Sequence, residues 1–281
     1  MSVLWSKMGI QILSDLHLEV PKAYDVFEIK PKAPHLALLG DIGNVAAHKD
    51  DFLGFLTRQL QQFQTVIFVP GNHEAYHSSW PKTLQILLAF QTDSNARKHD
   101  ASGAVLGEFV LLDRGVLRLP DSPDTMILGC SLFSHVPPES RTEVEMRLRD
   151  FFQTDEWDVD AHNEMHKRDL DWLNAQVSAL EGSDVEKIII FSHWSPTLDA
   201  RAIEPRHAGS RITSAFSTDL SKEKCFKSDR VKLWAFGHTH YNCDFVVKQD
   251  DGAGPLRLLT NQRGYYFAQS EGFDGGKTFE V

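Results

Sequence analysis

Short apolar runs recur along this chain, separated by stretches in which apolar and polar residues alternate with a helical period. Continuous apolar runs of this length are typical of strands that are buried on both faces of a sheet. The strongest runs lie at residues 10–13, 35–39, 65–69, 188–191 and 231–236. Weaker runs predict further strands at residues 109–112, 116–119, 126–132, 243–248, 256–260 and 277–281.

Four segments between the strands have the spacing of amphipathic helices. They are residues 48–63, the stretch after Pro81, Arg141–Phe152 and Asp160–Leu180. The buried face that we predict for the last helix consists of Met165, Trp172, Leu173, Val177 and Leu180. Strands that alternate with helices predict an α/β fold. No linker-like change in composition divides the chain, so we expect one domain over residues 1–281.

Two segments are predicted to be loops. Residues 92–104 are polar, and residues 195–230 have weak periodicity, with a short helix expected near residues 215–220. Loops as long as the second one are usually functional. Arg211 in this loop is a candidate substrate-binding residue, because a guanidinium can hold a phosphate through two hydrogen bonds. Its neighbours Arg201 and Arg206 are expected to be solvated, and His135 and His207 are weaker candidates to overhang a pocket.

Potential metal ligands follow five of the apolar strands, each at the strand's C-terminal end. Any one of them alone would be an ordinary turn residue. However, ligands bind outside the carboxyl ends of strands in open α/β sheets, so these five loops can converge on one pocket. Their carboxylate, amide and imidazole groups can hold two cations, and the absence of thiolates favours Mn, Fe or Zn. The residues are Asp15, His17, Asp41, Asn72, His73, His193, His238 and His240.

Such a centre would suit hydrolysis of a phosphate ester. Two ions that shared Asp41 would be about 3.5–4 Å apart, and a water held between them would lose its proton near neutral pH. The resulting metal-bridging hydroxide could attack phosphorus, while both ions offset the charge on the phosphoryl oxygens. A nearby histidine could then protonate the leaving alkoxide.

The same residues, taken in order, form five short motifs. They are Asp15-Leu16-His17, Gly40-Asp41, Gly71-Asn72-His73-Glu74, His193 and Gly237-His238-Thr239-His240. This series resembles the calcineurin-like metallophosphoesterase superfamily, in the order that the superfamily has and over most of the chain. The resemblance implies a four-layer α-β-β-α sandwich of two mixed sheets flanked by helices.

The resemblance also implies a role for each residue. One metal ion would be held by Asp15, His17, Asp41 and His240. The other would be held by Asp41, Asn72, His193 and His238, so that Asp41 bridges the two ions. His73 would be a catalytic residue, as proton donor or phosphate contact. Glu74 is expected to be a hydrogen-bond partner behind the ligands.

The chain departs from the protein Ser/Thr phosphatase branch after the bridging aspartate. Here Asp41 is followed by Ile42-Gly43-Asn44. The arginine that would clamp a phosphoprotein is missing, and Asn44 stands in place of the acid that orients the catalytic histidine. Asn44 is therefore a candidate to hold a phosphate oxygen. A phosphodiester or a small phosphomonoester, which includes nucleotides, fits this pattern better than a phosphoprotein does.

Two alternatives have a different function. A non-catalytic scaffold with this fold could serve protein–protein contact, but such members tend to lose ligands or the catalytic histidine, and this chain retains the full set. A DNA nuclease would need a basic surface or an added DNA-binding domain, whereas the formal net charge is -10. Long nucleic acid is therefore not an expected partner.

Composition bears on location. No apolar run approaches the roughly 20 residues that span a bilayer, and the N-terminal stretch lacks a signal-peptide layout. The three cysteines form no C-x-x-C pair. We therefore expect a cytoplasmic protein without membrane association, and the oligomeric state is left open.

Overall fold

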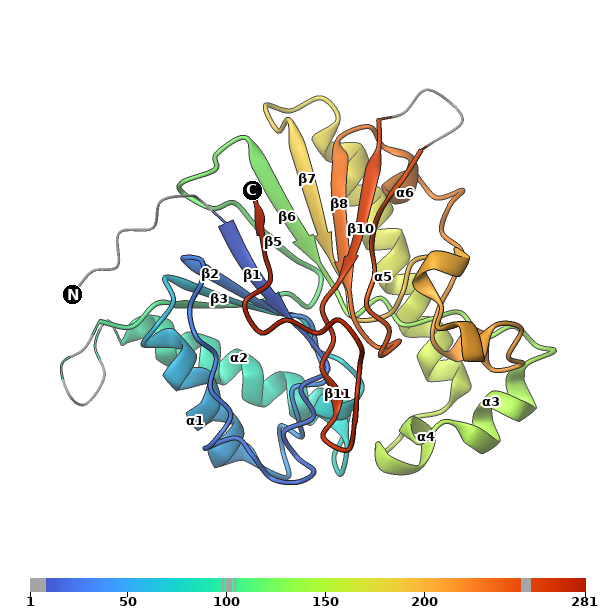
Figure 1. Cartoon of the computed structure of the whole chain (residues 1–281), viewed down its shortest axis with the longest axis horizontal. Coiled ribbons are helices and arrows are strands. Elements are labelled where there is room, and N and C mark those ends of the chain that lie inside the picture. Colours follow the sequence, from blue (N-terminus) through green and yellow to red (C-terminus); the bar gives the residue numbers. More distant parts are fainter. Residues whose placement is uncertain (1–8, 98, 100–102, 104, 249–253) are drawn as a thin grey trace.

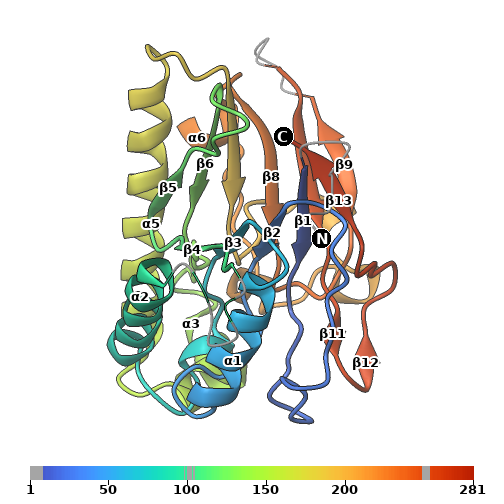
Figure 2. The same cartoon turned by 90° about the vertical axis from the view of Figure 1, so that its left-hand side faces the viewer.

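The computed structural model describes residues 9–97, 99, 103, 105–248 and 254–281. Two large β-sheets pack face to face, and helices cover their outer faces (Figures 1 and 2). Helices α1 and α2 cover the first sheet, and α5 and α6 cover the second. The predicted α/β class and the four-layer arrangement are therefore confirmed. Within the described residues, no helix is both long enough and apolar enough to cross a lipid bilayer.

The first sheet has the strand order β13-β1-β2-β3-β4. Its four sequential strands are parallel, and β13 pairs with β1 in the antiparallel sense. Its strands are β1 (Gly9–Leu13), β2 (His35–Leu38), β3 (Thr65–Phe68), β4 (Glu108–Leu111) and β13 (Thr278–Glu280), and its helices are α1 (Lys49–Leu60) and α2 (Trp80–Ala96).

The second sheet has the strand order β5-β6-β7-β8-β10-β9. Strands β6, β7, β8 and β10 are parallel, and the edge strands β5 and β9 are antiparallel to their neighbours. Its strands are β5 (Gly115–Leu117), β6 (Thr125–Gly129), β7 (Lys187–Phe191), β8 (Val231–Phe236), β10 (Leu256–Thr260) and β9 (Asp244–Val247), and its helices are α5 (Val159–Leu180) and α6 (Lys224–Lys227).

The continuous apolar runs are explained by this layering. In β2, Leu36 and Leu38 pack toward the helices, whereas Ala37 and the following Leu39 pack between the two sheets. Successive side chains of a strand point to opposite faces. Both faces of the parallel strands are buried, so almost every position is apolar.

Several segments differ from the sequence-based predictions. Helix α2 extends to Ala96, into the segment 92–104 that was predicted as loop. Polar side chains of α2 bond to the edge of β4, where a further strand would otherwise pair. Asn95 exchanges two hydrogen bonds of 2.8 Å with the backbone of Phe109. The Leu111 N–H donates to the Gln91 side chain at 2.6 Å. The rest of the predicted loop that falls on residues 98, 100–102 and 104 lies outside the described residues.

The helix predicted at Arg141–Phe152 is two short helices, α3 (Arg141–Arg147) and α4 (Asp150–Gln153). Leu148 between them has an extended ψ of 126° and is buried, which turns the chain. The helix predicted near residues 215–220 is wrong, because that region has a 3₁₀ turn at Thr213–Ala215 and α6 lies later.

Helix α5 begins one residue before its prediction, where the Asp158 side chain accepts a hydrogen bond from the Ala161 N–H at 2.8 Å. Its buried face is rotated from the one predicted, because polar groups find partners in the interior. His162, His166 and Asp169 are buried beside Leu173 and Val177, whereas Met165, Trp172 and Leu180 are only partly buried. A small hairpin of β11 (Gly264–Tyr265) and β12 (Ala268–Gln269) was not predicted.

Candidate metal centre and active site

The candidate ligands lie where the parallel strands of both sheets end. Asp15, Asp41 and Asn72 follow β1, β2 and β3 of the first sheet, and His193 and His238 follow β7 and β8 of the second. The two sheets face each other, so these loops meet at one edge of the sandwich. The structure brings together all seven predicted ligands, together with His73. Only His240 among the seven is more than slightly exposed, with 25% of its side chain accessible.

The backbone is left-handed at five of these ligands, with φ between 46° and 68°. Residues other than glycine adopt this conformation rarely, and such strain concentrates at functional sites. Here the left-handed conformation turns the ligand side chains of these tight loops toward one centre. The residues are Asp15, His17, Asp41, His238 and His240.

A first cluster of ligand atoms forms around His17 and His240. The Nε2 atoms of these two rings are 2.9 Å apart. Asp15 Oδ1 lies 3.3 Å from His240 Nε2, and Asp41 Oδ2 lies 3.9 Å from His17 Nε2. Three donor atoms, from Asp15, His17 and His240, therefore lie within the reach of one cation, and Asp41 Oδ2 lies beside them.

A second cluster forms around His193. Its Nε2 lies 3.1 Å from Asn72 Oδ1, 3.2 Å from His238 Nδ1 and 3.4 Å from Asp41 Oδ1. The other nitrogen of the His193 ring is 2.8 Å from the Leu39 carbonyl, to which it can donate. This contact leaves Nε2 free to be a ligand, since a ligating histidine usually donates its other N–H to such an acceptor. Asp41 thus has one carboxylate oxygen in each cluster.

The charges of the two clusters fit cations. Burial lowers the pKa of His17 and His238, which favours the neutral imidazole that binds metals. Burial alone would raise the pKa of Asp41, but the surrounding histidines hold it well below its usual value, so the carboxylate is ionised. Burial likewise opposes a charge on His193, yet Asp41 and Asp15 raise the pKa of that ring to about 9. The position therefore strongly favours positive charge, and its nitrogen and oxygen donors suit divalent ions of the Mn, Fe and Zn type.

The amide of Asn72 is oriented by a residue that the sequence did not single out. Asp150, at the start of α4, accepts hydrogen bonds from Asn72 Nδ2 at 2.9 Å and from the Tyr76 hydroxyl at 2.5 Å. With Nδ2 held in this way, the Asn72 oxygen faces the second cluster. Asp150 lies 78 residues from Asn72, so no local pattern indicates the contact.

Glu74 supports both metal-binding turns, as expected of a hydrogen-bond partner behind the ligands. Its Oε2 accepts from the N–H groups of Asp41 at 2.9 Å and Gly71 at 2.6 Å. Its Oε1 accepts from Ile42 at 2.8 Å and Gly43 at 3.4 Å. One fully buried carboxylate therefore holds the turns after β2 and β3 against each other.

His73 is oriented by Glu19, a second residue that sequence reasoning missed. Glu19 Oε1 lies 2.7 Å from His73 Nδ1 and 3.3 Å from His17 Nδ1. These hydrogen bonds lower the pKa of Glu19 to about 2, although burial opposes that shift. Burial also opposes a charge on His73, but Asp41 and Glu19 raise its pKa to about 9. The available signal was the position of an acid two residues after His17 in the same turn.

Substitution of Glu19 tests this pairing. In Glu19→Gln the amide oxygen can still accept from His73 Nδ1, but the negative charge is lost. We expect the pKa of His73 to fall by about one unit or more. Since a proton donor loses activity as pH rises through its pKa, the alkaline limb of the pH–rate profile should move to lower pH. The profile of Glu28→Gln, which changes an exposed acid in a nearby loop, is the control. An unmoved alkaline limb in Glu19→Gln would exclude this role.

The two predicted substrate-binding residues lie elsewhere. Asn44 is buried and donates through Nδ2 to the His73 carbonyl at 2.8 Å, so it holds the backbone of the turn. Arg211 is exposed. Neither is among the residues that line the cavity at the metal centre. Asn44 therefore contacts the backbone of the turn that carries His73, and Arg211 lies outside the cavity lining; a phosphate contact by either residue stays a prediction.

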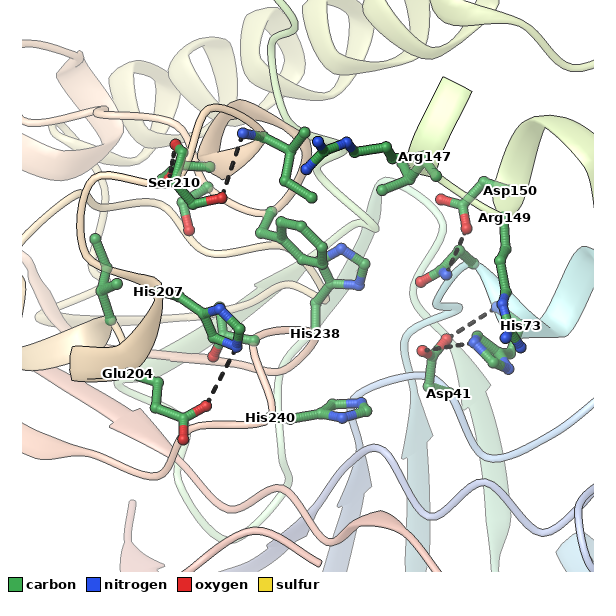
Figure 3. A pocket seen from close by; sticks show the side chains of 18 of the residues that line it. Asp41, His73, Arg147, Arg149, Asp150, Glu204, His207, Ser210, His238 and His240 are labelled. Atoms are coloured by element: carbon green, nitrogen blue, oxygen red, sulfur yellow. Dashed lines mark hydrogen bonds and ion pairs between the residues drawn. The ribbon is translucent and has the colours of Figure 1, made fainter. Parts of the chain in front are cut away.

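A cavity of about 370 Å³ opens over the metal centre (Figure 3). One side is formed by Asp41, His73, Arg149 and Asp150, and the opposite side by Glu204, His207 and Ser210. The long 195–230 segment and the α3–α4 corner therefore both contribute walls. Tyr265, from the β11–β12 hairpin, stacks on His17 with ring centroids 4.1 Å apart, and its hydroxyl lies 3.4 Å from His73 Nε2. Of the weaker histidine candidates, His207 lines this cavity and His135 does not.

Known proteins resemble this chain in sequence or in fold. The chain is 24% identical over 280 residues to the uncharacterised protein L509 of Acanthamoeba polyphaga mimivirus, with 91% of each chain covered. The fold of this chain is similar to that of the phosphopantetheinyl hydrolase PptH from Mycobacterium tuberculosis, with a TM-score of 0.62 and 16% sequence identity. The match covers 93% of this chain and 91% of the other. The model of the calcineurin-like phosphoesterase family matches residues 8–242, which include all the candidate ligands. The chain therefore belongs to the calcineurin-like phosphoesterase family.

Proposed function

We propose that this protein is a dinuclear metal-dependent phosphoesterase that hydrolyses phosphodiesters or small phosphomonoesters. The observation that carries the proposal is the arrangement of Asp41, whose two carboxylate oxygens face two separate clusters of ligand atoms. A shared carboxylate of this kind would suit a pair of divalent ions, one for each cluster. When bound, such ions supply an activated water and neutralise the charge that develops on the phosphoryl oxygens.

The chain's own residues would handle the leaving group. His73 is protonated near neutral pH, and its Nε2 lies 3.8 Å from Asp41 Oδ2, so the ring is directed at the centre. From there it can donate a proton to the oxygen of the departing alcohol. Glu19 contacts the Nδ1 atom of the ring, and the Tyr265 hydroxyl lies near its Nε2 atom, so both residues orient the ring.

The cavity supports a small phosphorylated compound as substrate. A volume of about 370 Å³ lies in the range of small-molecule sites. Its walls include the apolar side chains of Ile203, Ile212 and Phe216, which can cover the organic part of an ester. Nucleotides and phosphopantetheine esters, the second suggested by the name of the mycobacterial protein of similar fold, are therefore useful probes.

A metal and substrate panel tests the proposal. Purified protein loaded with Mn, Fe, Zn or Mg is assayed on aryl monoesters, aryl diesters, cyclic nucleotides, dinucleotides and phosphopantetheine esters. We expect hydrolysis of at least one class, its loss after chelation, and its return when metal is added back. A silent panel from protein that binds two ions per chain would instead favour the non-catalytic scaffold.

A further inference from the structure

Arg149 is held at the mouth of the cavity by its neighbours. Leu148 and Asp150 on either side are buried, and Asp150 is bonded to Asn72 and Tyr76. Arg149 itself is exposed. Figure 3 shows the Arg149 side chain extending from the start of α4 toward His73. The contact that orients a candidate ligand also sets the position of this arginine.

Arg149 differs from the other two arginines that line the cavity. Arg147 pairs with Glu143 at 3.1 Å, and Arg206 pairs with Glu204 at 2.7 Å. Among the described residues, the guanidinium of Arg149 has neither an ion-pair partner nor a hydrogen-bond acceptor. The positive charge of Arg149 nevertheless has an electrostatic effect on a residue of the site, Tyr265. Burial and nearby carboxylates raise the pKa of Tyr265, and the charge of Arg149 opposes that rise.

We propose that Arg149 binds an anionic oxygen of the substrate's phosphoryl group and makes the site prefer phosphomonoesters to phosphodiesters. This inference rests on the proposed phosphoesterase function. A guanidinium presents parallel N–H donors that match the oxygens of a phosphate. A monoester carries up to two negative charges near pH 7, and a diester carries one. A fixed cation at the cavity therefore gains more from the monoester.

The test uses manganese-loaded protein and two kinds of probe. Binding of orthophosphate and of dimethyl phosphate is measured by calorimetry, and hydrolysis is measured with p-nitrophenyl phosphate and bis(p-nitrophenyl) phosphate. Arg149→Met should weaken orthophosphate binding about tenfold or more, the usual size of a hydrogen bond to a charged group, and should weaken dimethyl phosphate binding less. Arg149→Lys should be intermediate. Both variants should keep the wild-type metal content.

Two further variants serve as comparisons. Arg168→Gln removes an exposed charge from α5, away from the cavity, and should leave all four measurements unchanged. Arg211→Met removes the arginine that the sequence favoured. Loss of orthophosphate affinity in Arg211→Met with none in Arg149→Met would overturn the assignment. Equal losses for both anions in Arg149→Met would overturn the monoester preference.

The outcomes separate this inference from the proposed function. Hydrolysis by the wild-type protein with unchanged binding in Arg149→Met would overturn the role of Arg149 alone. Absence of hydrolysis, together with weaker orthophosphate binding in Arg149→Met, would support the anion contact and count against the phosphoesterase.

Discussion

Asp41→Asn should abolish hydrolysis and reduce the bound metal from two ions toward one per chain. The Asp41 Oδ1 atom accepts a hydrogen bond from the His73 N–H at 2.9 Å, so the amide oxygen of the variant should take that place and remain in the second cluster. The NH₂ group would then replace Oδ2 in the first cluster, where it cannot be a ligand. We therefore expect selective loss of the ion that Asp15, His17 and His240 would hold.

The size of the effect follows from what the shared carboxylate does. Removal of a single group that stabilises transition-state charge costs about 10²–10³-fold in rate, and loss of an ion removes more, so turnover should fall at least about 10³-fold. Metal analysis and kinetics on the same preparation are the measurement. Asp184→Asn, an exposed acid paired with Arg118, is the control. Wild-type turnover with two bound ions in Asp41→Asn would disprove the bridging role.

Glu74→Gln should destabilise the fold by about 2–4 kcal/mol and weaken metal binding as well. Each Glu74 oxygen accepts from two backbone N–H groups. A glutamine has one acceptor oxygen, so its NH₂ group must face two of these donors, which are then left without partners in the interior. A buried donor without a partner costs about 1–3 kcal/mol. The turns that carry Asp41 and Asn72 should also lose their fixed positions relative to each other, which would weaken metal binding.

Urea unfolding of metal-free protein measures the first effect, and titration with Mn²⁺ measures the second. Metal-free protein is essential, because bound ions would add their own stabilisation. Glu108→Gln changes an exposed acid on β4 and is the matched control. If Glu74→Gln unfolds at the wild-type urea concentration, the four hydrogen bonds are not what joins the two turns.

The candidate ligands could be selected from sequence, and their meeting at one place expected, because each follows a local rule. An apolar run predicts a buried strand, and the polar residue after it predicts a group at the sheet edge. The partners of these groups follow no such rule. Glu19 and His73 are 54 residues apart, and their contact depends on how the turns after β1 and β3 meet. The arginine at the cavity was missed for the same reason: Arg149 reaches the site only because the chain turns at Leu148, where no glycine or proline indicates a break.

The rotation of α5 has a similar origin. The apolar pattern of α5 predicts that Met165 and Trp172 face the core. Polar residues of the helix are buried instead, where they find hydrogen-bond or ion-pair partners. Asp169 is such a case, since it pairs with Arg114 at 2.6 Å and accepts from the Leu132 N–H at 2.8 Å. Both partners come from other parts of the chain, so hydrophobic periodicity alone could not indicate the burial.

Each ligand cluster draws on both sheets of the sandwich. In the first, Asp15 and His17 come from the turn after β1, and His240 comes from the turn after β8; in the second, Asp41 and Asn72 face His193 and His238. An ion in either cluster would act as a crosslink between the two sheets, in addition to the apolar contacts between them and hydrogen bonds such as that between the His193 ring and the Leu39 carbonyl. A free metal concentration a thousand times the dissociation constant would add about 4 kcal/mol to the free energy of unfolding. The metal concentration would then set the stability of the folded protein as well as its rate of hydrolysis.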